Sequence, residues 1–235
     1  MTEFRPGGFS LIPPVIKNLV IINVLIWLAQ QVFSNNPNFS IEDLFALHDV
    51  HSVYFRPHQL VTYMFLHGPG LSHILFNMFA LWMFGSILEN LWGAKRFLIF
   101  YLICGIGAGV LHLVSLYIEM LPAWESFKML PGYKQEELLY SDRFIFNSTT
   151  VGASGAVMGC LAAFGYLFPN SVIYLYFFLP IKAKWFVIIY GALELWMAIR
   201  NSAGDNVAHW AHLGGAAFGL ALVWLWNKTN RKTFY

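Results

Sequence analysis

Ser154 lies in a glycine-rich stretch, Gly152-Ala153-Ser154-Gly155, at the start of a long apolar segment. If a helix begins here, its first backbone N–H groups have no partner within the helix and favour a nearby negative charge. A nucleophilic serine needs such donors to hold the oxyanion that forms when it attacks a carbonyl group. Small residues four apart, such as Gly155 and Gly159, are also common where two membrane helices touch. The stretch therefore predicts a reactive serine, a helix-packing face, or both.

Two histidines open the last apolar segment. His209 and His212 are three residues apart and share one face of a helix. Gly215 and Gly219 continue the face of His212, and such a strip of small residues allows a very close approach to another helix. If it meets the glycine strip that follows Ser154, His212 is brought within the hydrogen-bond reach that a general base needs.

A third polar face lies at the start of an earlier apolar segment, where His73 and Asn77 are four residues apart. Polar side chains inside an apolar helix need partners. Aimed at a developing oxyanion, these two could stabilise it by hydrogen bonding. The commoner alternative is a pair of hydrogen bonds that bridge neighbouring helices.

The composition is that of a membrane protein. Of the 235 residues, 58% are hydrophobic and only 11% are charged, whereas about 25% charged residues are typical of soluble domains. The net charge of +2 is too small to indicate a nucleic-acid partner. Cys104 and Cys160 fall inside apolar segments and are expected to be core residues, without a disulfide or a metal.

A membrane-spanning helix needs about 20 apolar residues. Six segments approach this length, at about 15–33, 72–91, 97–117, 152–168, 184–199 and 207–226. Another apolar stretch, 171–179, is too short to span and ends at Pro180, so we expect an interfacial strand or loop there. The sequence thus predicts a single all-α domain over residues 1–235, built as a bundle of six transmembrane helices.

The charges predict how this bundle is oriented. Two long polar insertions, about 34–71 and 119–151, fall on the same side of a six-span bundle. The short segments on the other side carry most of the Lys and Arg residues. The positive-inside rule then places both termini in the cytoplasm, with the long loops facing outward.

With these three features, the sequence resembles the rhomboid family of intramembrane serine proteases. Gly152-Ala153-Ser154-Gly155 matches its Gly-x-Ser-Gly box, and Ala211-His212 with the glycines at 215 and 219 matches its Ala-His-x-x-Gly-x-x-x-Gly box. His73 with Asn77 matches its His-x-x-x-Asn box. The resemblance covers about residues 57–226, to which the segment at about 15–33 adds a first transmembrane helix.

The resemblance implies a Ser–His dyad without a third, acidic member. Ser154 would be the nucleophile and His212 the general base. The oxyanion would be bound by the backbone N–H of Ser154 and by the side chains of His73 and Asn77. Gly152 would let the backbone turn into the helix at low strain. No cofactor and no metal are implied.

Other polar residues have expected roles of their own. Family members often carry an aromatic residue four positions after the serine, on which the catalytic imidazole stacks; here that residue is Met158. Glu194 is expected to bond a neighbouring helix or to cap a hydrated cavity. Glu89 is expected to brace the turn at 93–96, and Asp205 to cap the last helix.

The implied function is cleavage of the transmembrane helices of other membrane proteins, within the lipid bilayer. The implied location is a bacterial inner membrane, with an active site that opens outward. One alternative is an inactive relative that binds transmembrane helices without cutting them. A metal-dependent membrane enzyme would use the eight histidines, although the sequence has no His-Glu-x-x-His motif. A transporter would also carry buried polar groups and broken helices.

Overall fold

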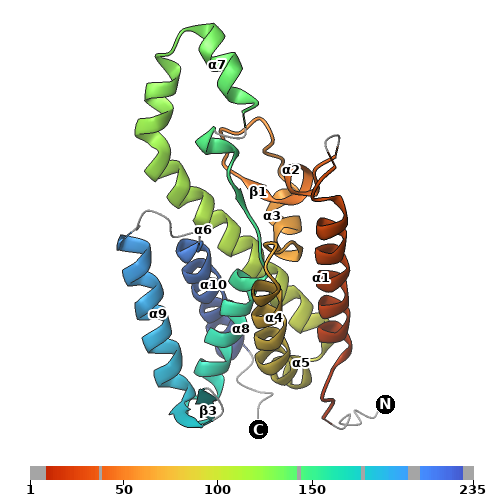
Figure 1. Ribbon diagram of the computed structural model, residues 1–235. Coiled ribbons are helices and arrows are strands. Elements are labelled where there is room, and N and C mark those ends of the chain that lie inside the picture. Colours follow the sequence, from red (N-terminus) through yellow and green to blue (C-terminus); the bar gives the residue numbers. More distant parts are fainter. Residues whose placement is uncertain (1–8, 37–38, 142–143, 176–177, 201–206, 230–235) are drawn as a thin grey trace.

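The structure is a computed structural model that describes residues 9–36, 39–141, 144–175, 178–200 and 207–229. Asp205, the predicted cap of the last helix, lies outside this part of the chain. The described residues form a bundle of long helices with two small antiparallel strand pairs (Figure 1). The chain is therefore an integral membrane protein of the all-α class, as its composition predicts.

Three helices among the described residues are long and apolar enough to cross a bilayer. The first is α1 (Pro14–Phe33). The second, Leu71–Trp92, consists of α4 (Leu71–Ala80), a single π-helical turn η2 (Leu81–Gly85) and α5 (Ser86–Trp92). The third is α6 (Ala94–Lys128). Half of the six predicted spans thus meet both criteria.

The other three predicted spans are also helical, but each departs from an ideal span. Helix α8 (Ser154–Leu167) is apolar yet only 14 residues long. Helix α9 (Ala183–Arg200) has 18 residues, with Lys184, Glu194 and Arg200 among them. Helix α10 (His209–Thr229) has 21 residues, including two histidines and three glycines that lower its hydropathy. The count of six spans stays a prediction.

Helix α6 is much longer than the predicted span of 97–117. Its 35 residues extend over about 50 Å at the usual helical rise, whereas the hydrocarbon core of a bilayer is about 30 Å thick. The last turns therefore stand clear of the other helices and lead into α7 (Gly132–Leu139), as Figure 1 shows. Phe127, Phe144 and Phe146 form a small core beneath this extension.

Short elements close the same end of the bundle. They are α2 (Ile41–Phe45), β1 (Leu47–His48), α3 (Gln59–Thr62), η1 (Tyr63–Phe65), η3 (Ile145–Asn147) and β2 (Thr149–Thr150). Strands β1 and β2 pair antiparallel, with Leu47 opposite Thr150. The two long polar insertions are thereby joined to each other at their bases.

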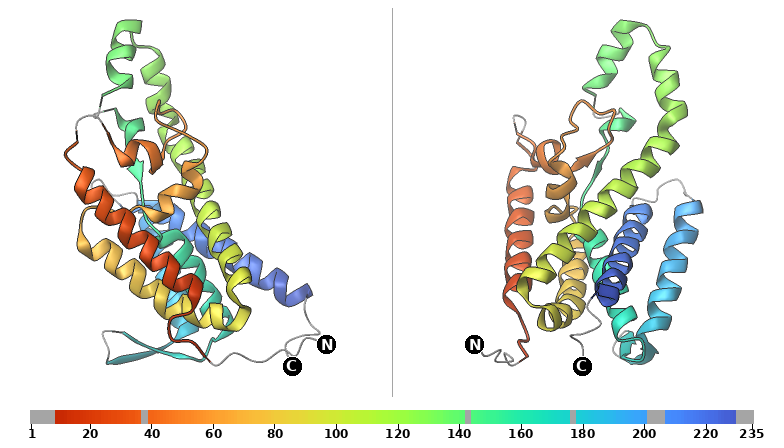
Figure 2. Two further views of the ribbon diagram at one scale, coloured as in Figure 1. Left: turned by 90° about the vertical axis from the view of Figure 1, so that its right-hand side faces the viewer. Right: turned by 180° about the vertical axis from the view of Figure 1, so that it is seen from behind.

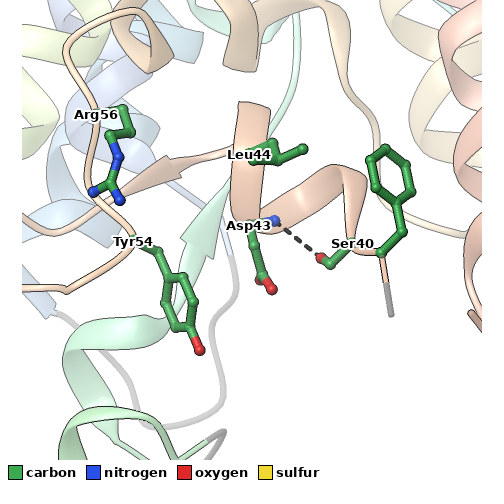
Figure 3. Close-up of a pocket in the computed structure, with 6 residues that line it drawn as sticks. Ser40, Asp43, Leu44, Tyr54 and Arg56 are labelled. Carbon is green, nitrogen blue, oxygen red and sulfur yellow. Dashed lines mark hydrogen bonds between the residues drawn. The ribbon is translucent and has the colours of Figure 1, made fainter. Parts of the chain in front are cut away.

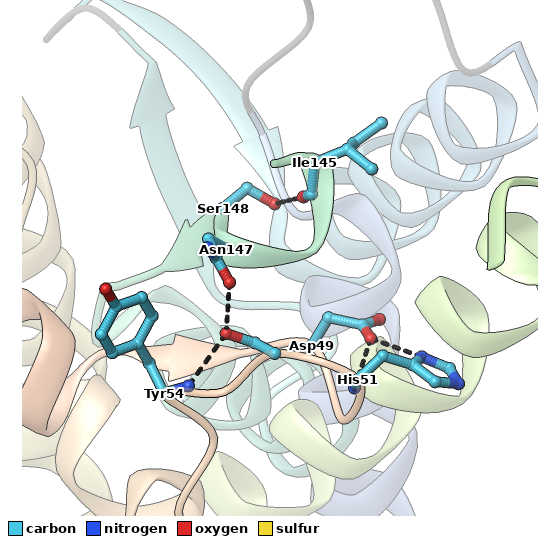
Figure 4. A network of polar contacts seen from close by, with 7 residues as sticks. Asp49, His51, Tyr54, Ile145, Asn147 and Ser148 are labelled. Carbon is cyan, nitrogen blue, oxygen red and sulfur yellow. Dashed lines mark hydrogen bonds and ion pairs between the residues drawn. The ribbon is translucent and has the colours of Figure 1, made fainter. Parts of the chain in front are cut away.

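A polar network holds these two insertions together (Figure 4). The hydroxyl of Ser52 donates to Oδ1 of Asn147 at 2.7 Å and accepts the backbone N–H of Tyr54 at 3.1 Å. Asp49 accepts the backbone N–H of His51 at 2.8 Å and contacts its Nδ1 at 2.7 Å. The 119–151 insertion is thus anchored at its base.

At the opposite end, the apolar stretch after α8 forms a hairpin of β3 (Val172–Leu175) and β4 (Leu179–Lys182). The two strands pair antiparallel, with Ile173 opposite Ile181. Of the two expected forms, a strand or a loop, the structure contains strands here.

Helix α8 lies at the centre of the bundle, and eleven of its residues are buried. Helices α10 and α6 pack against it, and α10 also packs on α6. Helix α9 lies at the periphery, as the rear view in Figure 2 shows. The central position of α8 follows from its sequence of small and apolar residues, which leaves no polar face for solvent.

Glu89 has a structural role, and its side chain acts at a place that the sequence does not indicate. Its two carboxylate oxygens accept the backbone N–H groups of Val15 and Ile16, each at 2.9 Å. The side chain is 3% exposed and caps the start of α1, where Pro13 has no side chain that could do so. Glu89 thus joins the second apolar helix to the first through its side chain, while its backbone carbonyl accepts the N–H of Gly93 at 2.8 Å at the start of the 93–96 turn.

Candidate active site

Ser154 and His212 lie side by side, although 58 residues separate them in the sequence. Nε2 of His212 is 2.8 Å from Oγ of Ser154. Ser154 is partly exposed, whereas His212 is 9% exposed. This is hydrogen-bond distance between a hydroxyl group and a base, in a bundle of apolar helices.

The backbone before Ser154 turns sharply into α8. Gly152 has a φ of 132°, a conformation that a side chain would strain. Its N–H donates to the carbonyl of Tyr63 at 3.0 Å. An extended segment descends from β2 into the bundle, and α8 begins only at Ser154 (Figure 1). The first N–H groups of α8 are consequently next to the Ser154 hydroxyl, without partners in their own helix.

The two glycine strips meet as their spacing predicts. A side chain at Gly215 would overlap the carbonyl group of Gly155. One at Gly219 would approach the backbone of Gly159 to 2.8 Å. Backbone-to-backbone contact on this scale is possible only where both helices lack side chains. The strips therefore set the register of α10 against α8.

His73 faces the same turn. Its Nδ1 accepts the backbone N–H of Gly68 at 3.1 Å. A neutral ring with an accepting Nδ1 carries its proton on Nε2. That atom lies on the side of Gly152, because a side chain added there would come within 3.0 Å of it. His73 thus presents a donor to the turn that precedes Ser154.

Asn77 is placed differently. Its Nδ2 donates to the carbonyl of His73, four residues earlier in α4, at 2.9 Å. This bond uses one of the two hydrogens of the amide nitrogen. The side chain is 7% exposed. The structure therefore brings His73 to the Gly152–Ser154 turn and ties Asn77 to its own helix.

A carboxylate approaches both histidines of α10, which the sequence boxes do not indicate. Oε2 of Glu194, in α9, is 2.6 Å from Nδ1 of His209 and 3.0 Å from Nδ1 of His212. The three side chains are between 5% and 9% exposed. The signal available in the sequence was an acid inside an apolar segment. Its partners could not be read, because they belong to another helix.

These three residues are also the group of described side chains that could hold a metal ion, since one ligand atom from each lies within 4.8 Å of the others. Ligands of a tetrahedral zinc ion are separated by about 3.3 Å, given metal–ligand bonds of about 2.0–2.1 Å. The separations from Oε2 to the two nitrogens are 2.6 and 3.0 Å. Hydrogen bonding therefore accounts for the arrangement better than metal coordination does.

A separate hollow lies in the first polar insertion, lined by Phe39, Ser40, Asp43, Leu44, Tyr54 and Arg56 (Figure 3). The hydroxyl of Ser40 accepts the N–H of Asp43 at 3.0 Å and caps α2. None of the lining residues belongs to the group around Ser154. We therefore assign the hollow no part in the chemistry of the serine.

The bundle and the Ser154–His212 pair together define a membrane protein with a candidate nucleophilic serine between its helices. Comparison with known sequences agrees with this class. The family described as the Rhomboid domain matches residues 54–229. The chain belongs to the rhomboid family.

Similar proteins come from plants and bacteria. RHOMBOID-like protein 12, mitochondrial, of Arabidopsis thaliana is 28% identical over 222 residues, which is 94% of this chain and 60% of that protein. Rhomboid protease AarA of Providencia stuartii is 31% identical over 66% of this chain and 51% of its own length. Rhomboid protease GluP of Bacillus subtilis (strain 168) is 30% identical over 71% of this chain and 26% of its own length. The chain thus spans 26% to 60% of the length of these relatives.

Proposed function

We propose that the chain is an intramembrane serine endopeptidase with Ser154 as nucleophile and His212 as general base. The main support is the 2.8 Å separation between Oγ of Ser154 and Nε2 of His212 within the helix bundle. Membership of the rhomboid family, with relatives named rhomboid proteases, supports the same conclusion. Residues 1–235 act as one domain in this proposal.

The reaction proceeds in two stages. The Oγ of Ser154 attacks the peptide carbonyl while Nε2 of His212 takes its proton. The scissile C–N bond then breaks, and His212 returns the proton to the leaving amine. Water then attacks the acyl carbonyl while Nε2 of His212 takes its proton; the acyl–Oγ bond breaks, and His212 returns the proton to Oγ of Ser154.

The negative charge on the substrate oxygen is held by hydrogen-bond donors around the turn before α8. The backbone N–H of Ser154 and the Nε2–H of His73 are the main donors in this proposal, which the position of His73 beside the Gly152 turn supports. Asn77 contributes its remaining amide hydrogen. Gly152 keeps this turn open, because a side chain there would crowd His73.

The substrate is a transmembrane helix of another membrane protein, bound within the lipid bilayer. A helix hides its carbonyl groups in hydrogen bonds, so it must unwind locally before attack. Glycine, proline and other weak helix formers near the cut therefore favour cleavage. Helix α9 is a candidate side gate, since it is peripheral and exposes bulky residues such as Trp185 and Trp196.

We further propose that the enzyme resides in a bacterial inner membrane with both termini in the cytoplasm. The long insertions, including the extension of α6 and α7, then face outward. The extended segment that leads from these insertions to Ser154 supports an active site open to that side.

Cleavage of a test transmembrane substrate in liposomes is the direct experiment. Wild type should cut the substrate, whereas Ser154→Ala and His212→Ala should each lower the rate by a factor of about 10³ or more. A fluorophosphonate probe should label the wild type and not Ser154→Ala. Helix binding without cleavage by the wild type would instead indicate an inactive relative, and labelling that persists in Ser154→Ala would reject the assigned nucleophile.

A further inference from the structure

Glu194 is an unusual residue in its helix. The buried residues of α9 are Ala183, Glu194 and Ala198, and its large apolar side chains, such as Ile188 and Leu193, are exposed and suited to lipid. An isolated carboxylate at this position would be costly, because charges in a membrane need partners. The helix nevertheless turns this acid inward, against α10.

Glu194 contacts both histidines of α10, in each case at Nδ1 of the ring. Nδ1 of His209 forms a hydrogen bond of 2.6 Å to Oε2. Nδ1 of His212 is 3.0 Å from the same oxygen but is not aligned for a hydrogen bond to it, and the buried Nδ1 has no other hydrogen-bond partner. The carboxylate is thus held by one histidine and lies next to the other.

This placement matters for the proton that His212 must accept. Nε2 can take the proton of Ser154 only if the ring already carries its own proton on Nδ1. A carboxylate beside Nδ1 favours that tautomer and stabilises the imidazolium that forms during attack.

The aromatic surroundings of the His212 ring are sparse among the described residues. The side chain one turn after Ser154 is that of Met158, an unbranched and flexible thioether. The ring contact recorded for His212 among the described residues is an edge contact with His209, whose centroid is 6.3 Å away. Orientation by Glu194, 3.0 Å from Nδ1, therefore adds a polar restraint to this edge contact.

We propose that Glu194 is a positioning residue that completes a Ser154–His212–Glu194 triad across three helices, with His209 holding the carboxylate. The inference rests on the proposed function, because it concerns the base of the same site. The proton moves from Oγ of Ser154 to Nε2 of His212 and then to the leaving amine. Glu194 stays ionised throughout, and Nδ1 keeps its proton.

The test compares kcat, KM and thermal unfolding in full-length variants. Glu194→Gln should lower kcat by a factor of about 100 while KM stays within about twofold. Glu194→Asp keeps the charge and should recover part of kcat relative to Gln. His209→Gln, which leaves Glu194 in place, should cost less than about tenfold. Glu125→Gln, on the exposed part of α6, serves as the matched control.

Other outcomes would overturn the triad. If Glu194→Gln has the kcat of the wild type, the carboxylate does not orient the base. If kcat, KM and the unfolding temperature change together and Asp recovers nothing, Glu194 only clamps α9 to α10. Loss of activity in the wild type on adding EDTA would indicate a metal ion instead. Activity retained in Ser154→Ala would reject the proposed function itself, whereas inactive Ser154→Ala beside a fully active Glu194→Gln rejects the triad alone.

Discussion

The backbone of Gly215 in α10 lies directly against that of Gly155 in α8, so closely that a side chain at position 215 would overlap the Gly155 carbonyl group. His212 precedes Gly215 by three residues, and Ser154 precedes Gly155 by one. The closest approach of the two helices therefore lies within one helical turn of the 2.8 Å pair. The glycines place Ser154 and His212 side by side by fixing the register of the two helices.

This contact predicts that Gly215→Ala abolishes the proposed cleavage activity without altering the side chain of Ser154 or His212. The helices must separate to admit the methyl group, which should destabilise the fold by about 1–3 kcal/mol and lower kcat by a factor of about 100. Gly191→Ala in α9 is the matched control, since a side chain there meets nothing within 4 Å. Cleavage assays and thermal unfolding in detergent measure both effects. Full activity of Gly215→Ala would contradict the assigned register.

The placement of His73 and Asn77 predicts unequal contributions to the stabilisation of the oxyanion. His73→Ala should lower kcat by a factor of about 10²–10³, which is typical for loss of one oxyanion donor. Asn77→Ala should cost less, because its amide donates to the backbone of its own helix. Steady-state cleavage by both variants makes the comparison. A larger loss in Asn77→Ala would mean that the amide, and not the imidazole, faces the substrate oxygen.

The cap on α1 predicts a stability effect far from the serine. Glu89→Ala leaves the N–H groups of Val15 and Ile16 without their acceptor and should destabilise the protein by about 2 kcal/mol. Glu125→Ala removes an exposed pair with Lys128 and should cost less than about 0.5 kcal/mol. Thermal unfolding in detergent distinguishes them. Equal losses in the two variants would show that the cap contributes little.

His67, in the loop before α4, should make the stability of the protein depend on pH. Burial, with a smaller effect of the neighbouring His73, lowers the pKa of His67 to about 4. The folded protein therefore keeps this ring neutral, while the unfolded chain binds a proton below the ordinary pKa of about 6.5. Stability from His67 is complete above pH 6.5 and is lost as the pH falls towards 4, by about 2 kcal/mol between pH 6.5 and 5.

A comparison of His67→Gln with the wild type isolates this contribution. The variant should lose less stability than the wild type between pH 7.5 and 5, as measured by thermal unfolding at each pH. Burial lowers the pKa of His48 as well, so part of the acid sensitivity should persist in the variant. Parallel curves for the two proteins would show that His67 is already accessible to protons in the folded state.

Local sequence predicted most of the elements near the site. Apolar runs gave the positions of all six long helical segments to within a few residues, apart from the end of α6. The spacing of Gly155, Gly159, Gly215 and Gly219 predicted a helix contact that the structure contains. Helix positions and the face on which a residue lies depend on residues that are near each other in the chain. Helical periodicity therefore allows both to be predicted from the sequence.

Contacts between segments far apart in the chain could not be predicted from local sequence. Helix α6 continues to Lys128 because its last turns pack on an aromatic cluster that includes Phe144 and Phe146, from the returning segment. The apolar run alone predicted an end at about residue 117. The sequence also did not indicate the partner of the Glu89 carboxylate, because that group accepts N–H groups at a helix start 74 residues earlier.

The sequence by itself determined the class of protein, its helical segments and the residues that could react, since composition and spacing carry that information. Only the tertiary structure decided that Glu194 lies against His209 and His212, that His73 lies against the turn before Ser154, and that Asn77 donates to the carbonyl of His73. The physical reason is that these relationships depend on the rotation and depth of each helix. Packing of the whole bundle fixes both, and no single segment specifies them.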